Sequence, residues 1–344
     1  MKYIGNLRAR PGRYFWGKRW FYARRSKHYD MERDPLLLRC YARQVRAALS
    51  DIAADVVFSP GTIPIAYLKT EKPIVFWTDA TFAGMIDFYG YVSNLCRETI
   101  RDGNKMEQSA LSRSRLAIYS SDWAAQTAIN YYRVDPRKVR VVPFGANVDG
   151  DRDWQTVEAV VSRKALDRCQ LLFIGVDWLR KGGDKALSVA ARLNQKGMPT
   201  TLHVVGCTPP VSVPRWVTVH GFVSKHSEEG RRQLDRLFNE SHFLILPSRA
   251  ECYGIVLSEA SSFGLPSLAT NVGGIPTAIR NGVNGYMFPL DADDDEYADY
   301  VLGVMASRET YQRLALTSFK EYSERLNWSS IGNNVSQLIH EFCT

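Results

Sequence analysis

The chain has 344 residues, of which 45% are hydrophobic and 23% charged, so it is long enough for two globular domains of ordinary composition. Its six cysteines and six histidines show neither CxxC pairs nor metal-ligand spacing, which argues against a disulfide framework and a structural zinc site. No apolar run is as long as a membrane helix and the basic N-terminus has no apolar segment, so we expect a cytoplasmic protein without a signal peptide.

The positive charge is concentrated at the start of the chain. Residues 1–46 contain 13 Lys and Arg against 3 Asp and Glu, a balance of +10, whereas the whole chain carries +8. Within this region, residues 13–25 (RYFWGKRWFYARR) interleave aromatic side chains with cations. These cations are Arg13, Lys18, Arg19, Arg24 and Arg25.

Aromatic rings beside cations favour an anionic surface, such as phospholipid headgroups or a phosphate-bearing acceptor. Bound in this way, the protein would be peripheral at the inner face of the membrane. A solvated arm, or a helix whose aromatics belong to the core, would give the same pattern. Nucleic acid fits it less well, and we expect none as a partner.

Short apolar or β-branched runs in the first half predict buried strands at residues 55–60, 73–80, 116–122 and 139–145. Longer segments separate them and are interpreted as helices or loops. Strands that alternate with helices favour a parallel sheet, so residues 1–150 are interpreted as an N-terminal, acceptor-side Rossmann-like domain. The charged stretch 148–168 is the expected junction.

The second half repeats this rhythm, with strands expected at 170–175, 201–206, 216–221, 242–247 and 266–270. Helical patterns lie between them, one of which ends near Gly197. Residues 151–325 are therefore interpreted as a second Rossmann-like domain, and residues 326–344 as a C-terminal helix that packs back across the junction. The predicted fold class is α/β, with two Rossmann-like domains facing a central cleft.

One stretch of the second half, residues 249–266 (RAECYGIVLSEASSFGLP), contains two glutamates eight positions apart. Gly254 follows the loop after strand 242–247 and opens a predicted helix. A helix start presents free N–H groups that suit a phosphate, and a glycine lets the ligand approach the backbone. Glu259 lies just over a turn inside and leans back toward that start, where it can accept hydrogen bonds from ribose hydroxyls.

Glu251, in the loop before the helix, would meet a second hydroxyl-rich group on the other side of the phosphates. Arg180 and Lys181 precede Gly182-Gly183 after strand 170–175, and adjacent cations can clamp a diphosphate without a metal. Ribose, diphosphate and sugar in a row describe a nucleotide sugar. A solvated basic turn and two unrelated glutamates are the alternative interpretation.

These motifs resemble the retaining family-4 glycosyltransferases, also called glycosyl transferases group 1, which have the two-Rossmann (GT-B) fold. The Glu251–Glu259 stretch has the form of the family's E-x7-E signature. Residues 175–184 (GVDWLRKGGD) and 264–288 (GLPSLATNVGGIPTAIRNGVNGYMF) follow the family's order.

The resemblance implies a nucleotide-diphosphate-sugar donor, held mainly by the C-terminal domain, and an acceptor held mainly by the N-terminal domain. It implies no further cofactor and no metal. Retention is usually explained in this family by front-face attack, in which the leaving phosphate takes the acceptor proton, so we expect no protein nucleophile. The acceptor is a glycan, a lipid-linked sugar or another hydroxyl compound.

The resemblance also assigns roles to single residues. It places Glu251 at the transferred sugar, the backbone of Tyr253, Gly254 and Ile255 at the sugar and distal phosphate, and Glu259 at the ribose. It places Arg180 and Lys181 at the diphosphate, and the loops after residues 201–206 and at residues 221–225 beside the base. In the first domain Asp79, at the end of strand 73–80, either orients an acceptor or sugar hydroxyl or caps a helix.

Two features depart from the family pattern. Val176 stands where the family commonly has arginine, so Arg180 is expected to compensate. The family's first strand–helix unit, with its glycine-rich loop, is not found before residue 55. A nucleotide-sugar-binding protein with little or no turnover is therefore an alternative, and another sugar-nucleotide enzyme, such as an epimerase, is a third interpretation.

Overall fold

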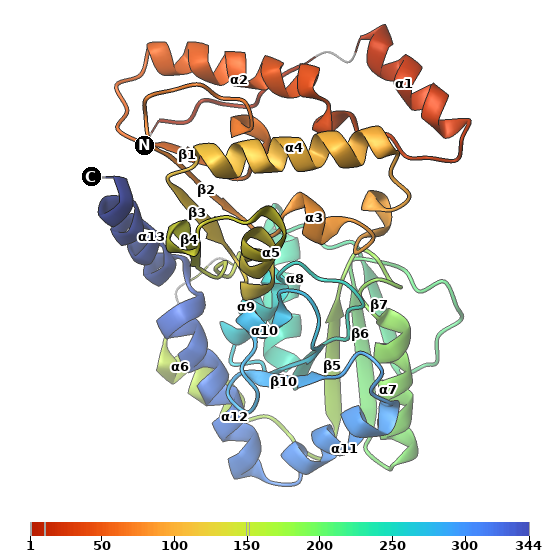
Figure 1. The fold of residues 1–344 in the computed structure, drawn as a ribbon. Helices are drawn as coiled ribbons and strands as arrows, with labels where there is room; N and C mark the ends of the chain where they lie inside the picture. Colours follow the sequence, from red (N-terminus) through yellow and green to blue (C-terminus); the bar gives the residue numbers. More distant parts are fainter. Residues whose placement is uncertain (1, 10–11, 149, 151, 344) are drawn as a thin grey trace. The chain divides into compact units, whose positions relative to one another are not determined.

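A computed structural model describes residues 2–9, 12–148, 150 and 152–343 (Figure 1). The chain divides into two compact units, of which the first combines Met1–Val142 with Asn334–Thr344 and the second is Pro143–Asn333. The second domain was expected to begin at residue 151, which lies outside the described residues. The expected domain limits therefore stay a prediction.

The first unit contains a four-stranded parallel sheet whose order follows the chain, β1-β2-β3-β4. Because each strand pairs with the next, the strand order has no reversal in the described part of this unit. The two inner strands, β2 and β3, are mostly buried apolar runs, as expected for a sheet covered on both faces. The bounds of the four strands are Val57–Ser59, Ile74–Thr78, Leu116–Tyr119 and Val139–Val141.

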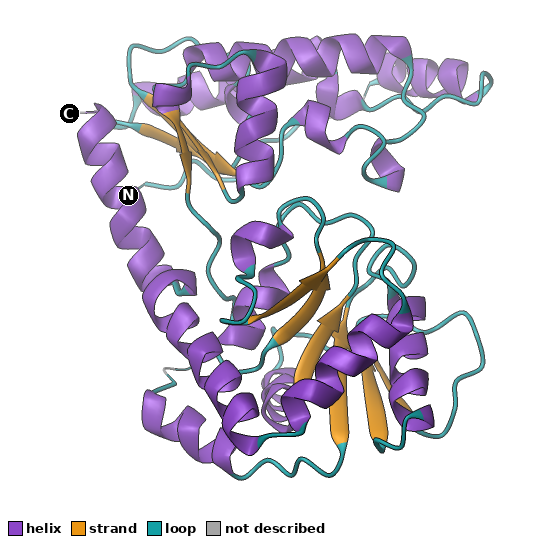
Figure 2. Cartoon of the chain, turned by 60° about the horizontal axis from the view of Figure 1, so that its bottom comes forward, coloured by secondary structure: helices purple, strands orange, loops and turns teal. Residues whose placement is uncertain are grey.

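Helices cover the sheet of the first unit, and Figure 2 shows the strands in orange between purple helices. The main ones are α2 (Pro35–Ser50), α4 (Arg97–Arg113) and α5 (Asp122–Tyr132), with the short α3 (Phe82–Met85) after β2. The end of α13 (Trp328–Cys343) also belongs to this unit, where the Nε of Arg115 donates a 2.8 Å hydrogen bond to the carbonyl of Phe342.

Helix α1 (Arg13–Ala23) contains the aromatic and basic stretch and has no buried residue, so the interpretation of its aromatics as core is wrong. Phe15, Lys18 and Tyr22 are half-buried on one face. The prediction that Lys18 is one of the surface cations is also wrong. Its Nζ lies 2.9 Å from Asp34 and 2.6 Å from Glu98, and its side chain is 18% exposed.

The second unit contains a six-stranded parallel sheet in the order β10-β9-β8-β5-β6-β7. Read from β7, this is the 3-2-1-4-5-6 order of the Rossmann fold, in which the order reverses between β5 and β8. Five of the strands match predicted runs, whereas β10 was not predicted. The bounds, from β5 to β10, are Cys169–Ile174, Thr200–Val205, Val217–Gly221, Phe243–Leu246, Ser267–Thr270 and Gly285–Phe288.

Two apolar clusters fill the second unit, one on each face of its sheet. The α/β class and the two Rossmann-like domains expected from the sequence are therefore confirmed.

No helix in the described ranges is long and apolar enough to span a bilayer. The helices of this unit are α6 (Trp154–Ser162), α7 (Gly183–Gln195), α8 (Glu228–Glu240), α9 (Ile255–Ser261), α10 (Ile275–Ala278), α11 (Asp294–Met305), α12 (Arg308–Glu321), a π-helical turn (Tyr322–Leu326) and the start of α13.

Candidate functional site

The reversal of strand order in the second unit brings two loops to the carboxyl edge of the sheet. After β5 the chain moves toward β6, and after β8 it moves toward β9, so the two loops leave neighbouring strands in opposite directions. Open α/β sheets bind ligands at such a point. The loops are residues 175–182 and 247–254, and both contain predicted site residues.

Three of the predicted residues meet between these loops. The Nζ of Lys181 is ion-paired with Oε2 of Glu251, and Nη1 of Arg180 lies 3.8 Å from the same oxygen. The Glu251 residue is only 6% exposed, so water screens these charges less than it would at the surface. The Nε of Arg180 also lies 3.6 Å from the carboxylate of Asp177, so the two cations are balanced by one buried and one exposed carboxylate.

A reciprocal set of hydrogen bonds fastens the two loops together. Arg180 donates from Nη1 to the carbonyl of Ala250 at 3.0 Å, and the backbone N–H of Arg249 donates to the carbonyl of Arg180 at 2.8 Å. The guanidinium of Arg249 donates to the carbonyl of Leu179 and, through both terminal nitrogens, to Asp184 at 2.8 and 2.7 Å. Hydrogen bonds from Arg249 lower the pKa of Asp184 below its usual value.

Gly182 is required where the loops touch. Its φ is +76°, and a Cβ built on it would lie 2.0 Å from the carbonyl oxygen of Pro247. Any other residue would strain the backbone and collide with the second loop. The glycine that follows the two cations therefore determines how closely they approach Glu251.

Glu259 lies in the second turn of α9 and is 2% exposed. Its carboxylate is paired with Nζ of Lys225, from the loop after β7, at 2.5 Å, and it accepts a hydrogen bond from the backbone of Asn147. Burial raises the pKa of Glu259, and the charge of Lys225 opposes that shift. Sequence reasoning included Lys225 in a range that flanks the base, but did not identify it as the partner of Glu259.

The three residues expected to act through their backbone lie at the start of α9. Gly254 precedes the helix with φ +84°, and Ile255 is its first residue. The Tyr253 ring is buried at 1% exposure, and its hydroxyl donates a 2.9 Å hydrogen bond to the carbonyl of Phe144. Burial raises the pKa of this hydroxyl to about 12, so the side chain is a neutral part of the core.

Asp79 belongs to the first unit, at the carboxyl end of β2, whereas the other predicted site residues belong to the second. The interpretation of Asp79 as a helix cap is wrong, because Thr81 caps α3 by accepting a hydrogen bond from the N–H of Gly84 at 3.1 Å. Its acceptor-side role stays a prediction.

Exposed apolar side chains are found on the loops that leave the carboxyl edge of the second sheet. Val176 and Leu179, after β5, are 70% and 62% exposed, and Phe222, after β7, is 78% exposed. Exposed apolar groups at a ligand-binding edge can contact a flat ring such as a nucleobase. Phe222 lies in the segment expected to flank the base.

Comparison with known proteins shows which families and structures the chain resembles. Residues 156–320 match the family model for glycosyl transferases group 1. D-inositol 3-phosphate glycosyltransferase from Geodermatophilus obscurus is 29% identical over an alignment of 231 residues, which covers 59% of this chain and 48% of the relative. The same enzyme from Mycolicibacterium paratuberculosis is 29% identical over an alignment of 211 residues, which covers 58% of this chain and 46% of the relative. The chain spans about half the length of these relatives.

Solved structures share the fold. Sucrose-phosphate synthase from Thermosynechococcus elongatus has a TM-score of 0.66 at 16% identity, covering 89% of this chain and 78% of that one. HepE from Anabaena, in complex with UDP, has a TM-score of 0.66 at 15% identity, covering 88% and 82%. The family match, these likenesses and the strand order agree with the resemblance seen in the motifs. Residues 156–320 are therefore similar to the glycosyl transferases group 1, and the chain has the two-Rossmann (GT-B) fold of these solved structures.

Proposed function

We propose that this protein is a retaining glycosyltransferase that moves a sugar from a nucleotide-diphosphate sugar to a hydroxyl of a glycan, lipid-linked or other acceptor. The observation that carries the proposal is the cluster of Arg180, Lys181 and Glu251 between the loops where the strand order reverses. HepE, which shares the fold, is known in complex with UDP, so uridine nucleotides are the first donors to test.

The two cations hold the diphosphate in this proposal. A diphosphate arriving at the cluster attracts Lys181 and Arg180 more strongly than one carboxylate does, because it has more negative charge. Glu251 then loses its ion-pair partners and becomes available to accept hydrogen bonds from the hydroxyls of the transferred sugar. We propose that the cations supply the charge that a divalent metal supplies in other transferases.

The proposed chemistry needs positioning and electrostatic stabilisation more than a nucleophile. The bond between the sugar and the diphosphate breaks, the acceptor oxygen attaches to the same face of the sugar, and the leaving phosphate takes the acceptor's proton. Arg180 and Lys181 stabilise the charge that develops on the leaving group. The Glu259 carboxylate, together with Lys225, holds the ribose, and Phe222 contacts the base.

The acceptor side of the proposal belongs to the first unit. Asp79 orients an acceptor or sugar hydroxyl, and α1 binds an anionic membrane surface that holds a lipid-linked acceptor, at the cytoplasmic face. Support for the membrane partner comes from the outer face of α1, where several exposed aromatics stand among cations. Trp16 and Trp20 are both 59% exposed on this face.

A vesicle experiment tests the membrane partner. We expect wild type to sediment with phosphatidylglycerol vesicles at low salt and less at high salt, because each cation near an anionic surface contributes about 1 kcal/mol. A variant with Arg13, Arg24 and Arg25 changed to Gln should sediment less. Equal sedimentation would contradict the proposal. The matched control removes three exposed cations elsewhere in this unit, Lys69, Lys72 and Arg137.

The function itself is tested by UDP-sugar turnover. We expect calorimetry to show binding of UDP and UDP-sugars, and release of UDP that increases with a hydroxyl acceptor and persists in EDTA. Failure of every nucleotide diphosphate and nucleotide sugar to bind would overturn the proposal. Tight binding without release of the diphosphate would instead support a nucleotide-sugar-binding protein.

A further inference from the structure

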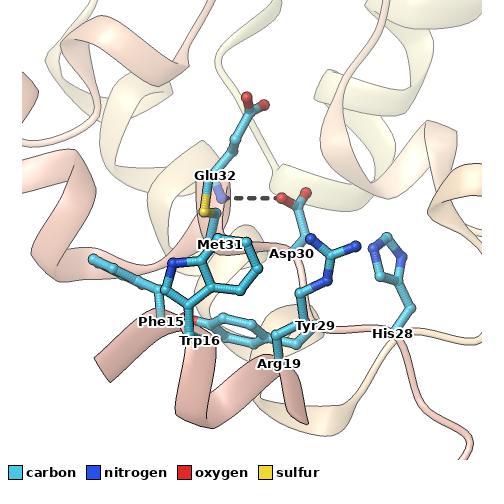
Figure 3. Close-up of a pocket in the computed structure, with 8 residues that line it drawn as sticks. All are labelled: Phe15, Trp16, Arg19, His28, Tyr29, Asp30, Met31 and Glu32. Atoms are coloured by element: carbon cyan, nitrogen blue, oxygen red, sulfur yellow. Dashed lines mark hydrogen bonds between the residues drawn. The ribbon is translucent and has the colours of Figure 1, made fainter. Parts of the chain in front are cut away.

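A cavity of about 280 Å³ lies in the first unit, between α1 and the segment 28–32 (Figure 3). No residue around it belongs to the proposed donor site, which is in the second unit. One wall comes from α1 and the other from the segment that follows it. The residues that carry the argument are Phe15, Trp16 and Arg19 on α1, and Tyr29, Asp30 and Met31 opposite.

The cavity is fixed by an anchored network beneath it. The hydroxyl of Tyr29 donates a 2.6 Å hydrogen bond to Asp34, and its ring stacks on Tyr22 with the centroids 5.9 Å apart. Lys18 joins the same Asp34 to Glu98 on α4, which holds α1 against the unit. Burial and the hydrogen bond to Asp34 raise the pKa of Tyr29, so it remains a neutral donor. A preformed cavity binds without the cost of ordering its walls.

The apolar part of the lining consists of the rings of Phe15, Trp16 and Tyr29 with the side chain of Met31. The polar part contains both charge signs. Arg19 lies with its guanidinium 5.9 Å from the centre of the Trp16 ring. Asp30 accepts a 2.9 Å hydrogen bond from the N–H of Glu32 and is paired with Arg33 at 3.3 Å.

This mixture provides hydrogen-bond groups of both kinds. Arg19 can donate, whereas the carboxylates of Asp30 and of Glu32, which also borders the cavity, can accept. A neutral ligand rich in hydroxyls can use both, because a hydroxyl donates to a carboxylate and accepts from a guanidinium. Its C–H face can pack on an indole ring.

We propose that this cavity is a saccharide-binding site that takes a neutral sugar residue packed on Trp16, with hydroxyls that donate to Asp30 and accept from Arg19. The volume is just below the ~300–1,000 Å³ of sites for drug-sized ligands, which suits one or two sugar residues. The inference goes beyond the proposed transfer, because binding here requires neither a nucleotide nor any residue of the second unit.

Helix α1 supplies its own matched control. Trp20 and Arg24 repeat the Trp–Arg pair one turn later, with the guanidinium 4.0 Å from the ring centre. Trp20 is as exposed as Trp16, at 59%, but neither Trp20 nor Arg24 borders the cavity. A membrane-binding face would use both pairs, whereas a saccharide in the cavity contacts only Trp16 and Arg19.

Saturation-transfer NMR on the full chain, without nucleotide, tests the site. The probes are maltose, cellobiose and methyl α-mannoside at millimolar concentration. We expect at least one of them to receive saturation from wild type, and Trp16→Ala and Arg19→Ala to bind it about tenfold more weakly, equivalent to about 1.4 kcal/mol. Trp20→Ala and Arg24→Ala should bind it as wild type does. Because α1 has no buried residue, these variants should stay folded.

Three results would overturn the proposal: no saturation transfer to any probe, equal losses of binding in the Trp16 and Trp20 variants, or stronger binding of choline or inorganic phosphate at the same cavity.

Asp30→Asn is a further variant, which keeps an oxygen to accept from the N–H of Glu32 but removes the charge. It should also weaken sugar binding. Calorimetry with UDP on the same proteins separates this proposal from the function proposed above. Loss of Trp16 should leave UDP affinity unchanged, whether or not wild type transfers sugar.

Discussion

At the scale of single residues, the ion cluster of the second unit joins two cations, Arg180 and Lys181, to the buried carboxylate of Glu251. Removing the carboxylate and removing a cation therefore have opposite effects on its charge. Without Glu251 the cluster attracts a diphosphate more strongly, whereas without Lys181 only Arg180 remains to attract it. This difference separates the two proposed roles.

We predict that Glu251→Gln binds UDP at least as tightly as wild type but transfers little sugar, because the hydroxyls of the sugar lose their charged acceptor. Lys181→Met should weaken UDP binding by about 10- to 100-fold, since a hydrogen bond to a charged group contributes about 1.5–3 kcal/mol. Calorimetry measures both. The control is Lys185→Met, on helix α7 just after the loop that contains Lys181 and paired with Asp294 at 3.0 Å. Weaker UDP binding by Glu251→Gln would contradict the assignment.

The proposed contact between Glu259 and the ribose is tested by removing the ribose hydroxyls from the nucleotide. If its carboxylate holds the ribose, wild type should prefer UDP over 2′,3′-dideoxy-UDP by about tenfold or more, from the same range of hydrogen-bond energies. Glu259→Gln should bind the two nucleotides with nearly equal affinity. A preference that survives in the variant would show that other groups hold the ribose hydroxyls.

Lys164 is buried, and its Nζ donates to the carbonyl of Ser241. Burial lowers the pKa of Lys164 from 10.5 to about 7. Between these values the unfolded chain binds a proton that the folded chain does not, so stability falls as the pH falls from about 10 toward 7.

We predict that the free energy of unfolding of wild type, relative to Lys164→Met, rises with pH over this window by up to about 1.4 kcal/mol per pH unit. Urea unfolding of the two proteins at several pH values measures it. If their stabilities run parallel from pH 7 to 10, Lys164 is charged in the folded state.

At the scale of elements, most strands of the two sheets were predictable because they are short runs rich in apolar or β-branched residues, which is typical of strands in a covered parallel sheet. β10 escaped prediction because its four residues, GYMF, contain a glycine and follow a loop rich in Gly and Asn. The contacts across loops escaped for another reason. Arg249 and Asp184 are 65 residues apart, and Lys225 and Glu259 are 34 apart, so no local pattern pairs them.

The loop fastening gives a prediction at this scale. Gly182→Ala should lower the free energy of unfolding by about 2–4 kcal/mol, for two reasons. The new Cβ collides with the carbonyl oxygen of Pro247, and alanine is disfavoured in the left-handed backbone conformation. The substitution should also weaken UDP binding by moving Arg180 and Lys181 away from the second loop.

Gly197→Ala is the control for this change. Gly197 has a similar φ of +87°, but nothing lies within 4 Å of the added Cβ. Its variant should therefore be destabilised only by the left-handed backbone, by about 1–2 kcal/mol, and should bind UDP as wild type does. Equal destabilisation of the two variants in thermal unfolding would show that the loop contact is not tight.

At the scale of the whole molecule, the second unit is an insertion in the sequence of the first. The chain leaves the first unit at Val142 and rejoins it at Asn334, within the continuous helix α13. Two covalent connections therefore join the units. We predict that a single protease cut near residues 148–152 gives two bands in a denaturing gel but one particle in native gel filtration, because residues 334–343 stay bound within the first unit. Separate elution of the fragments would contradict this.

The return of α13 to the first unit also has a consequence for synthesis of the protein. A ribosome makes residues up to 142, then the whole of the second unit, before the last part of the first unit leaves the exit tunnel. The first unit must therefore wait for its final helical turns, with the place where Arg115 meets Phe342 uncovered, while nearly two hundred residues of the second unit are translated. At about 5–20 residues per second this delay lasts on the order of ten seconds or more, during which the nascent first unit depends on its remaining contacts or on a chaperone.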